Sequence, residues 1–236
     1  MNARARNKPR LPGSDAALVA LLFALDPHAV GGVRLAGLPG PARTRWLKCV
    51  QALRGGDSPW LKVPVNVSDE RLLGGLDFAA TIGSGKPVFS TGLLESADGG
   101  VIVLAMAERV AESAAAVIAS VLDSGEVRTE RDGLTRTAPG RFGVIALDES
   151  MDDDEEIPEG LVDRLALCVS LREVELSELN FDGWTVAELE AARHRYTRVR
   201  VKDVHMEQLA QAAVAFGIPS LRAEVLALRV ARGMTA

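Results

Sequence analysis

A short stretch near the amino terminus has the residue types of a phosphate-binding loop, with two replacements. Residues 37–44 read Gly-Leu-Pro-Gly-Pro-Ala-Arg-Thr. In the pattern G-x-x-x-x-G-K-[ST], glycines let the backbone approach the phosphates, the lysine reaches the terminal phosphates and the hydroxyl binds Mg²⁺. Gly37 and Thr44 match, whereas Ala42 replaces the second glycine and Arg43 replaces the lysine. Arginine is planar and larger than lysine, so it is not an equivalent cation. We therefore interpret the stretch as a degenerate phosphate loop.

A second stretch, residues 80–87, contains Gly-Ser-Gly-Lys and can also be compared with the phosphate-loop pattern. Ala80 stands where the pattern has its first glycine. Pro87 stands where the pattern has Ser or Thr, so the hydroxyl is missing, and proline also disfavours the helix that should begin there. The preceding residues 76–82 lack the pattern of a strand. We predict a loop here, without a phosphate site.

The carboxylates that usually accompany a phosphate loop are missing as well. Acidic side chains at the end of an apolar strand normally hold Mg²⁺ and help to activate water. The apolar strand predicted at residues 101–106 ends in Ala105 and Met106, and the first carboxylate is Glu108. The pattern indicates a nucleotide-binding fold that has lost its hydrolytic chemistry.

The elements that position these residues alternate between strands and helices. Strands are predicted at 31–37, 61–66, 101–106, 142–147 and 168–171. Helices are predicted at 15–25, 43–53 and 112–124, with another capped by Ser68, and a hairpin turns at Asp132-Gly133. The acidic stretch 148–159 is predicted as a solvated loop, and purely helical periodicity follows at 186–195, 204–216 and 221–232. We therefore expect a basic tail (1–14), an α/β domain with hairpin inserts (15–175) and an all-helical lid (176–236).

Composition narrows the class of protein. The 236 residues carry a formal net charge of −5 and are 47% apolar, which suits a buried core and disfavours general nucleic-acid binding. Two distant cysteines are typical of a reducing compartment, and the three histidines are not spaced as a metal site. The apolar runs are shorter than the roughly 20 residues that span a bilayer. We expect a cytoplasmic protein with no transmembrane segment, no nucleic-acid partner and no metal-ligating residues.

Eight short segments, in sequence order, resemble the AAA+ modules of magnesium chelatase, the complex that inserts Mg²⁺ into protoporphyrin IX. They are residues 31–44, 63–75, 92–94, 100–104, 118–126, 130–133, 141–142 and Leu161-Val162-Asp163-Arg164-Leu165, which is similar to the family's Leu-Leu-Asp-Arg-Phe. The resemblance covers about residues 16–236 and implies a P-loop-type parallel sheet flanked by helices, with a C-terminal all-helical lid. Ala42, Arg43, Ala105 and Met106 resemble the D subunit, which has degenerate nucleotide motifs in many bacteria, more than the I subunit, which is the ATPase.

The resemblance also implies roles for two arginines. Arg164 matches the arginine finger that reaches a nucleotide held by the neighbouring subunit, and Arg222 matches the second sensor arginine at the start of a lid helix. Such cations stabilise phosphate charge from the rim of a site. Two plainer interpretations stay open: Arg164 in a surface ion pair with Asp163 or Glu159, and Arg222 as an ordinary charge on a helix face.

For function, the resemblance implies a subunit of the ATP-dependent chelatase. It would assemble into AAA+ rings with copies of itself and with the I subunit, and couple ATP hydrolysis to the porphyrin-binding H subunit in chlorophyll or bacteriochlorophyll synthesis. ATP and Mg²⁺ then act at the level of the complex, and Gly37, Gly40, Arg43 and Thr44 bind nucleotide weakly or not at all. The family's acidic linker and integrin-I-like domain are not among these residues, so we expect an N-terminal portion of a D subunit.

Two other functions compete with this one. The first is a chaperone-like AAA+ ATPase that hydrolyses its own ATP, with Arg43 and Thr44 binding phosphate and Glu108 or Glu149 activating the metal. The second is an AAA+ protein that remodels nucleic acids, which the negative net charge disfavours.

Overall fold

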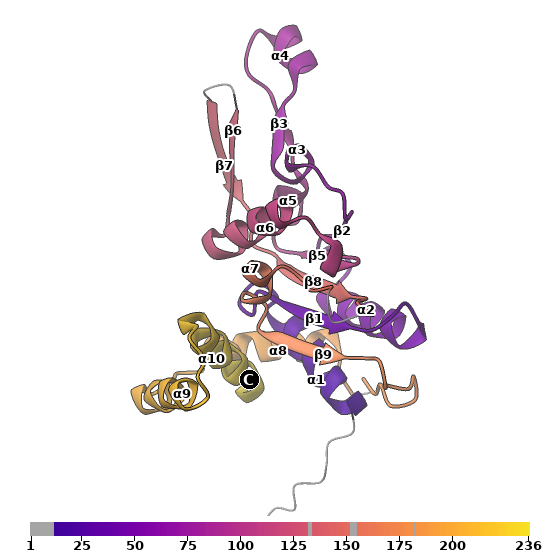
Figure 1. The fold of residues 1–236 in the computed structure, drawn as a ribbon, viewed down its shortest axis with the longest axis vertical. Helices are drawn as coiled ribbons and strands as arrows, with labels where there is room; N and C mark the ends of the chain where they lie inside the picture. Colours follow the sequence, from indigo (N-terminus) through magenta and orange to yellow (C-terminus); the bar gives the residue numbers. More distant parts are fainter. Residues whose placement is uncertain (1–11, 132–133, 152–154, 182) are drawn as a thin grey trace, which may run out of the picture.

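The computed structural model describes residues 12–131, 134–151, 155–181 and 183–236, and a five-stranded parallel sheet lies at its centre (Figure 1). The strands are β1 (Gly32–Ala36), β2 (Trp60–Val63), β5 (Val101–Leu104), β8 (Gly143–Asp148) and β9 (Leu167–Ser170). Their order in the sheet is β2-β5-β8-β1-β9, and every neighbouring pair is parallel. The carboxyl ends of all five strands therefore share one edge of the sheet, and the amino ends share the other.

Helices cover both faces of the sheet because its central strands are apolar on both sides. In β5, Val101 and Val103 belong to a first buried core, and Ile102 and Leu104 belong to a second. The first core includes α1 (Pro12–Leu25), α2 (Pro41–Arg54) and α8 (Val186–Tyr196), and the second includes α3 (Asp69–Leu73), α5 (Leu93–Ser96), α6 (Glu112–Ser124) and α7 (Glu159–Val162). Since successive side chains of a strand point to opposite faces, a strand buried on both faces reads as a continuous apolar run. The predicted α/β class is confirmed.

Trp46 anchors the helix that follows β1. Its side chain is fully buried in the first core, and its Nε1 donates a hydrogen bond of 2.8 Å to the carbonyl of Ala16. Because a buried indole N–H needs an acceptor, this bond fixes α2 against α1. The turn at residues 37–40 is thereby held at the carboxyl edge of the sheet.

Two hairpins project away from one end of the sheet (Figure 1). The first pairs β3 (Gly74–Leu76) with β4 (Phe89–Thr91) and carries α4 (Phe78–Ser84), and the second pairs β6 (Glu126–Arg131) with β7 (Leu134–Pro139). The hydroxyl of Thr129 donates to the carbonyl of Leu73 at 2.8 Å, and Arg136 forms an ion pair with Glu95 through two bonds of 2.6 and 2.8 Å. These contacts join the second hairpin to α5 and to Leu73, the last residue of α3, which immediately precedes the first hairpin. The predicted turn at residues 132–133 lies outside the described residues.

Several predicted elements need correction. The strands predicted at 61–66 and 101–106 end at Val63 and Leu104, and two helices also differ. The loop predicted at residues 80–87 is helical up to Ser84, because Asp77 caps α4 by accepting a bond of 2.9 Å from the Ala80 N–H and Gly85 ends it in the left-handed conformation. The first helix begins at Pro12, three residues earlier than predicted, and residues 1–11 of the expected tail lie outside the described part of the chain.

The carboxyl-terminal region is helical, as predicted. After α8, the chain forms α9 (Asp203–Ala215) and α10 (Leu221–Thr235), which pack on each other beside the α/β domain (Figure 1). Leu189 and Ala192 of α8 are buried in the first core. Within the described residues, no helix combines the length and the apolar character needed to cross a membrane.

Candidate functional site

The degenerate phosphate loop lies between β1 and α2, in the predicted order of strand, turn and helix. Backbone N–H groups at the start of such a helix cradle phosphates. Pro39 and Pro41 have no N–H to offer, and Thr44 donates its hydroxyl to the carbonyl of Gly40 at 2.9 Å. The loop therefore keeps the layout of a phosphate site but has fewer donors than an intact one.

Arg43 turns back over the loop and closes it with an ion pair. Its guanidinium donates to Oε1 of Glu149 at 2.8 Å and to the carbonyl of Gly37 at 3.3 Å. The Arg43 and Glu149 side chains are only 13% and 18% exposed. In an intact loop the cation at this position faces the phosphates, whereas here a carboxylate that directly follows β8 compensates it. A phosphate entering the loop would have to displace Glu149.

No carboxylate follows β5 directly, because Ala105 and Met106 stand there. Met106, with a φ of 49°, is the only non-glycine residue with a positive φ in the described part of the chain, and it leads into the 3₁₀ turn Ala107–Arg109. Left-handed backbone costs an L-residue about 1–2 kcal/mol, so the surrounding structure must hold this path. The path buries Glu108, whose Oε2 accepts a bond of 3.0 Å from the N–H of Glu149.

These residues do not match the donor set that a magnesium–nucleotide complex takes. Across the described residues, no three His, Cys, Asp or Glu side chains are grouped to hold a metal ion. A cavity of about 370 Å³ beside the loop is lined by Asp148, Glu149 and Arg172, so its formal charge is negative. Burial disfavours the charged form of Asp148, but hydrogen bonds from Ser150 and Arg34 outweigh burial and hold its pKa below the ordinary value. This carboxylate is charged at neutral pH, and its charge is compensated by Arg34, whose Nη2 lies 2.6 Å from Oδ2.

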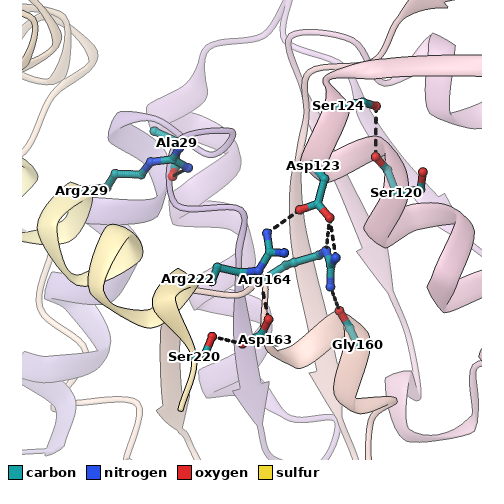
Figure 2. A network of polar contacts seen from close by, with 10 residues as sticks. All are labelled: Ala29, Ser120, Asp123, Ser124, Gly160, Asp163, Arg164, Ser220, Arg222 and Arg229. Carbon is teal, nitrogen blue, oxygen red and sulfur yellow. Dashed lines mark hydrogen bonds and ion pairs between the residues drawn. The ribbon is translucent and has the colours of Figure 1, made fainter. Parts of the chain in front are cut away.

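Arg164 and Arg222 lie side by side and share the carboxylate of Asp123 (Figure 2). Arg164 lies between α7 and β9, Arg222 is in the first turn of α10, and Asp123 is near the end of α6. Arg164 donates Nε to Asp123 at 3.0 Å and also binds the carbonyl of Gly160. Arg222 binds Asp123 through Nη1 and donates Nε to Asp163 at 3.0 Å. We call Arg164 and Arg222 the arginine pair.

The arginine pair lies at the opposite edge of the sheet from the phosphate loop. It lines a cavity of about 270 Å³ together with Gly31, which immediately precedes β1. The phosphate loop begins at Gly37, which immediately follows β1. At about 3.3 Å per residue, this five-residue strand spans about 16 Å. In this conformation neither arginine reaches the chain's own phosphate loop.

The ion-pair partners of Arg164 differ from those considered from the sequence. Asp163 and Glu159 were the candidate partners, but Arg164 pairs with Asp123, and Asp163 pairs with Arg222. Sequence reasoning missed Asp123 as a site residue. Asp123 lies near the carboxyl terminus of a helix, where the helix dipole disfavours a negative charge. Its residue type therefore does not point to a site, and the only available signal is that it lies in a segment that carries the family resemblance.

Replacing Asp123 by asparagine is expected to destabilise the protein at neutral pH, and the difference should shrink in acid. Burial disfavours the charged form, but the hydrogen bonds from the arginine pair outweigh burial and hold the pKa of Asp123 below its ordinary value of 3.8. A lowered pKa stabilises the fold above the unfolded-state pKa, and the contribution is lost as the pH falls through the folded-state value. Since these side chains are 19–37% exposed, we expect a loss of about 0.5–1 kcal/mol.

Urea unfolding of the wild type and Asp123→Asn across the acidic range measures this difference. It should be constant near neutrality and decline below about pH 4. Asp57→Asn, at an exposed position, is the matched control and should change stability little at any pH. A loss from Asp123→Asn that is as large in acid as at neutral pH would mean that the charge of Asp123 does not stabilise the fold.

The sheet order, the unit of strand, loop and helix, and the helical carboxyl-terminal region together define an α/β domain of the AAA+ type. Solved structures that share this fold include the following two. An ATPase candidate from Cytophaga hutchinsonii has a TM-score of 0.65 and 16% identity, covering 94% of this chain and 75% of that one. A chain from the complex between subunits BchI and BchD of magnesium chelatase has a TM-score of 0.56 and 21% identity, covering 97% and 96%.

Sequence comparison points more narrowly to magnesium-chelatase subunits. The chain is 35% identical over 225 residues to the 60 kDa subunit of Rhodobacter capsulatus and 37% identical over 215 residues to that of Cereibacter sphaeroides. It is 24% identical, over a 292-residue alignment, to the 38 kDa subunit of Rhodobacter capsulatus. The chain is therefore a homologue of magnesium-chelatase subunits and is more similar to these 60 kDa subunits than to the 38 kDa subunit. It spans about a third of the length of the 60 kDa relatives, and no protein-family model matches it.

Proposed function

We propose that this chain is the AAA+ portion of a D-type subunit of magnesium chelatase, which completes the nucleotide site of a neighbouring ATPase subunit and does not hydrolyse ATP itself. It assembles into a ring with copies of itself and with I-type subunits. Hydrolysis in that ring drives Mg²⁺ insertion into protoporphyrin IX on the H subunit, in chlorophyll or bacteriochlorophyll biosynthesis. The homology to chelatase subunits supports this role, and the free cysteines Cys49 and Cys168 support a cytoplasmic location.

The placement of the arginine pair carries the proposal. The pair lies at the amino edge of the sheet, and the chain's own phosphate loop lies at the carboxyl edge. Head-to-tail contacts between such domains join unlike edges, and contacts of that kind form rings when the rotation between neighbours closes. Arginines supplied by a neighbouring molecule stabilise the charge that develops on a transferred phosphoryl group. In the ring, Arg164 acts as the arginine finger and Arg222 as the second sensor, both on the neighbour's nucleotide.

The loop residues support the absence of hydrolysis by the chain itself. The charge of Arg43 is compensated by Glu149, and the N–H of Glu149 is bonded to Glu108. A self-sufficient ATPase would need one of these two carboxylates to activate a metal and Arg43 to bind phosphate. Arg43 and the carboxylate that activates the metal would both first have to leave their present partners.

Nucleotide binding and turnover test this function with the purified chain, alone and mixed with an I-type subunit. We expect no ATP turnover by the chain alone, no Mg-ATP binding that depends on Thr44, and faster hydrolysis by the mixture than by the I-type subunit alone. Titration calorimetry and a phosphate-release assay measure these quantities. Turnover by the isolated chain that disappears in Thr44→Ala would contradict the proposal and favour an independent ATPase.

A further inference from the structure

A second cavity at the amino edge of the sheet is lined by arginines that the proposed function does not use. Its volume is about 350 Å³, and its charged side chains are Arg54, Arg141 and Arg193 against one carboxylate, Asp26. With histidine neutral, the lining has a formal excess of two positive charges in a chain whose net charge is −5. Cations held together in this way repel one another unless an anion compensates them.

Arg54 and Arg193 are held in place without a carboxylate in contact. Arg54 donates Nη2 to the carbonyl of Gly99 at 2.8 Å, but its Nε is buried and has no hydrogen-bond partner within the described residues. Arg193 donates to the carbonyls of Ala24 and Leu25, at the end of α1, at 2.9 and 3.0 Å. Burial and the nearby charge of Arg193 both lower the pKa of Arg54. The acidic groups near this pair, Asp26 and Glu190, form no ion pair with either arginine.

Arg141 and His28 complete the cavity. The backbone N–H of Arg141 is fixed by Asp98 at 2.8 Å, while its exposed side chain forms no hydrogen bond or ion pair with any described residue. The Nδ1 atom of His28 is buried and likewise lacks a partner in the part of the chain that the structure describes. His28 also lines the cavity of the arginine pair, so the two cavities are neighbours.

We propose that this cavity, which we call the His28 pocket, binds a phosphate group, either as the free ion or as a phosphate ester. A phosphate group carries about two negative charges near neutral pH, which matches the formal excess in the pocket. Its oxygens accept hydrogen bonds from several guanidinium groups at once. A carboxylate carries a single charge, so it would leave one cation uncompensated. This inference does not depend on the role proposed for the arginine pair.

Titration calorimetry of the purified chain with inorganic phosphate and with AMP, in a buffer free of phosphate and sulfate, tests the proposal. We expect one bound ligand per chain and an affinity lower by about tenfold or more in Arg141→Gln, which removes a charge-assisted hydrogen bond. Arg141 is exposed, so the fold should be retained, and circular dichroism checks this. The matched control is Arg128→Gln, which removes the same charge from an exposed arginine of β6 and should leave the affinity unchanged.

Further titrations identify the source of the phosphate group and the place where it binds. Tighter binding of AMP than of inorganic phosphate would assign an ester, and the reverse would assign the free ion. Arg164→Gln should leave this binding intact. Loss of binding in Arg164→Gln but not in Arg141→Gln would place the anion at the arginine pair and overturn the inference. Tighter binding of glutamate than of phosphate, or no binding of phosphate and AMP at millimolar concentration, would overturn it as well.

Discussion

Replacing Arg164 by alanine is expected to lower Mg²⁺ insertion by the assembled chelatase about a thousandfold or more, with the fold intact. An arginine supplied by a neighbouring molecule typically contributes about 10³–10⁵ to the rate of phosphoryl transfer. Its structural contribution is much smaller, because the ion pair with Asp123 joins side chains that are 19% and 36% exposed. Such a pair stabilises a fold by about 1 kcal/mol at most. A finger role and a structural role for Arg164 therefore predict very different losses of activity.

Rates of ATP hydrolysis and porphyrin metalation in the reconstituted complex measure this effect, with thermal unfolding of the chain beside them. Arg128→Ala is the control, because this arginine of β6 is 68% exposed and pairs only with Glu130 among the described residues. It should leave both rates unchanged. Since Arg164 and Arg222 share Asp123, the double replacement should cost less than the sum of the single ones. Unchanged metalation by an assembled complex with Arg164→Ala would remove the arginine-finger role.

The strands of the sheet could be predicted because burial on both faces leaves a strong sequence signal. Residues 101–104 form a continuous apolar run and become β5, and α6 begins and ends at the predicted residues, 112 and 124. The start of α1 was missed because a proline in the first turn of a helix reads as a helix breaker, although the first turn tolerates it. The short helix α4 was missed because Pro87 and Gly83 disfavour a helix there, and a single aspartate cap is a weak local signal.

The candidate site could be predicted by residue type but not by contact. The replacements at Ala42 and Arg43 are visible in the sequence, but the pairing of Arg43 with Glu149 joins residues 106 apart. Sequence separation between interacting residues also explains why the acidic stretch 148–159 was predicted as a solvated loop. Asp148 ends β8 with 1% of its side chain exposed, because Arg34 on the neighbouring strand compensates it at 2.6 Å. Acidic side chains are almost never fully buried unless they are paired, and the partner of Asp148 lies outside any local pattern.

Replacing Gly31 by alanine should lower the free energy of unfolding by about 3 kcal/mol or more and displace the arginine finger. Gly31 has a φ of +68°, and a Cβ atom there would lie 2.0 Å from the carbonyl oxygen of Arg164. Because that neighbour is backbone, the chain at Arg164 has to move before the methyl group fits. We therefore expect the variant to lose stability and also the ability to stimulate hydrolysis by the I-type subunit, although Arg164 itself is unchanged.

Gly217→Ala separates the steric effect from the backbone strain. Gly217 also has a φ of +68°, but a Cβ atom there meets nothing within 4 Å, so only the left-handed penalty of about 1 kcal/mol is expected. Urea unfolding of both variants measures the difference, which we attribute to the contact with Arg164. Equal losses in the two variants would mean that the amino edge relaxes around the added methyl group. The position of the finger would then depend on Asp123 rather than on the packing of Gly31 against the Arg164 backbone.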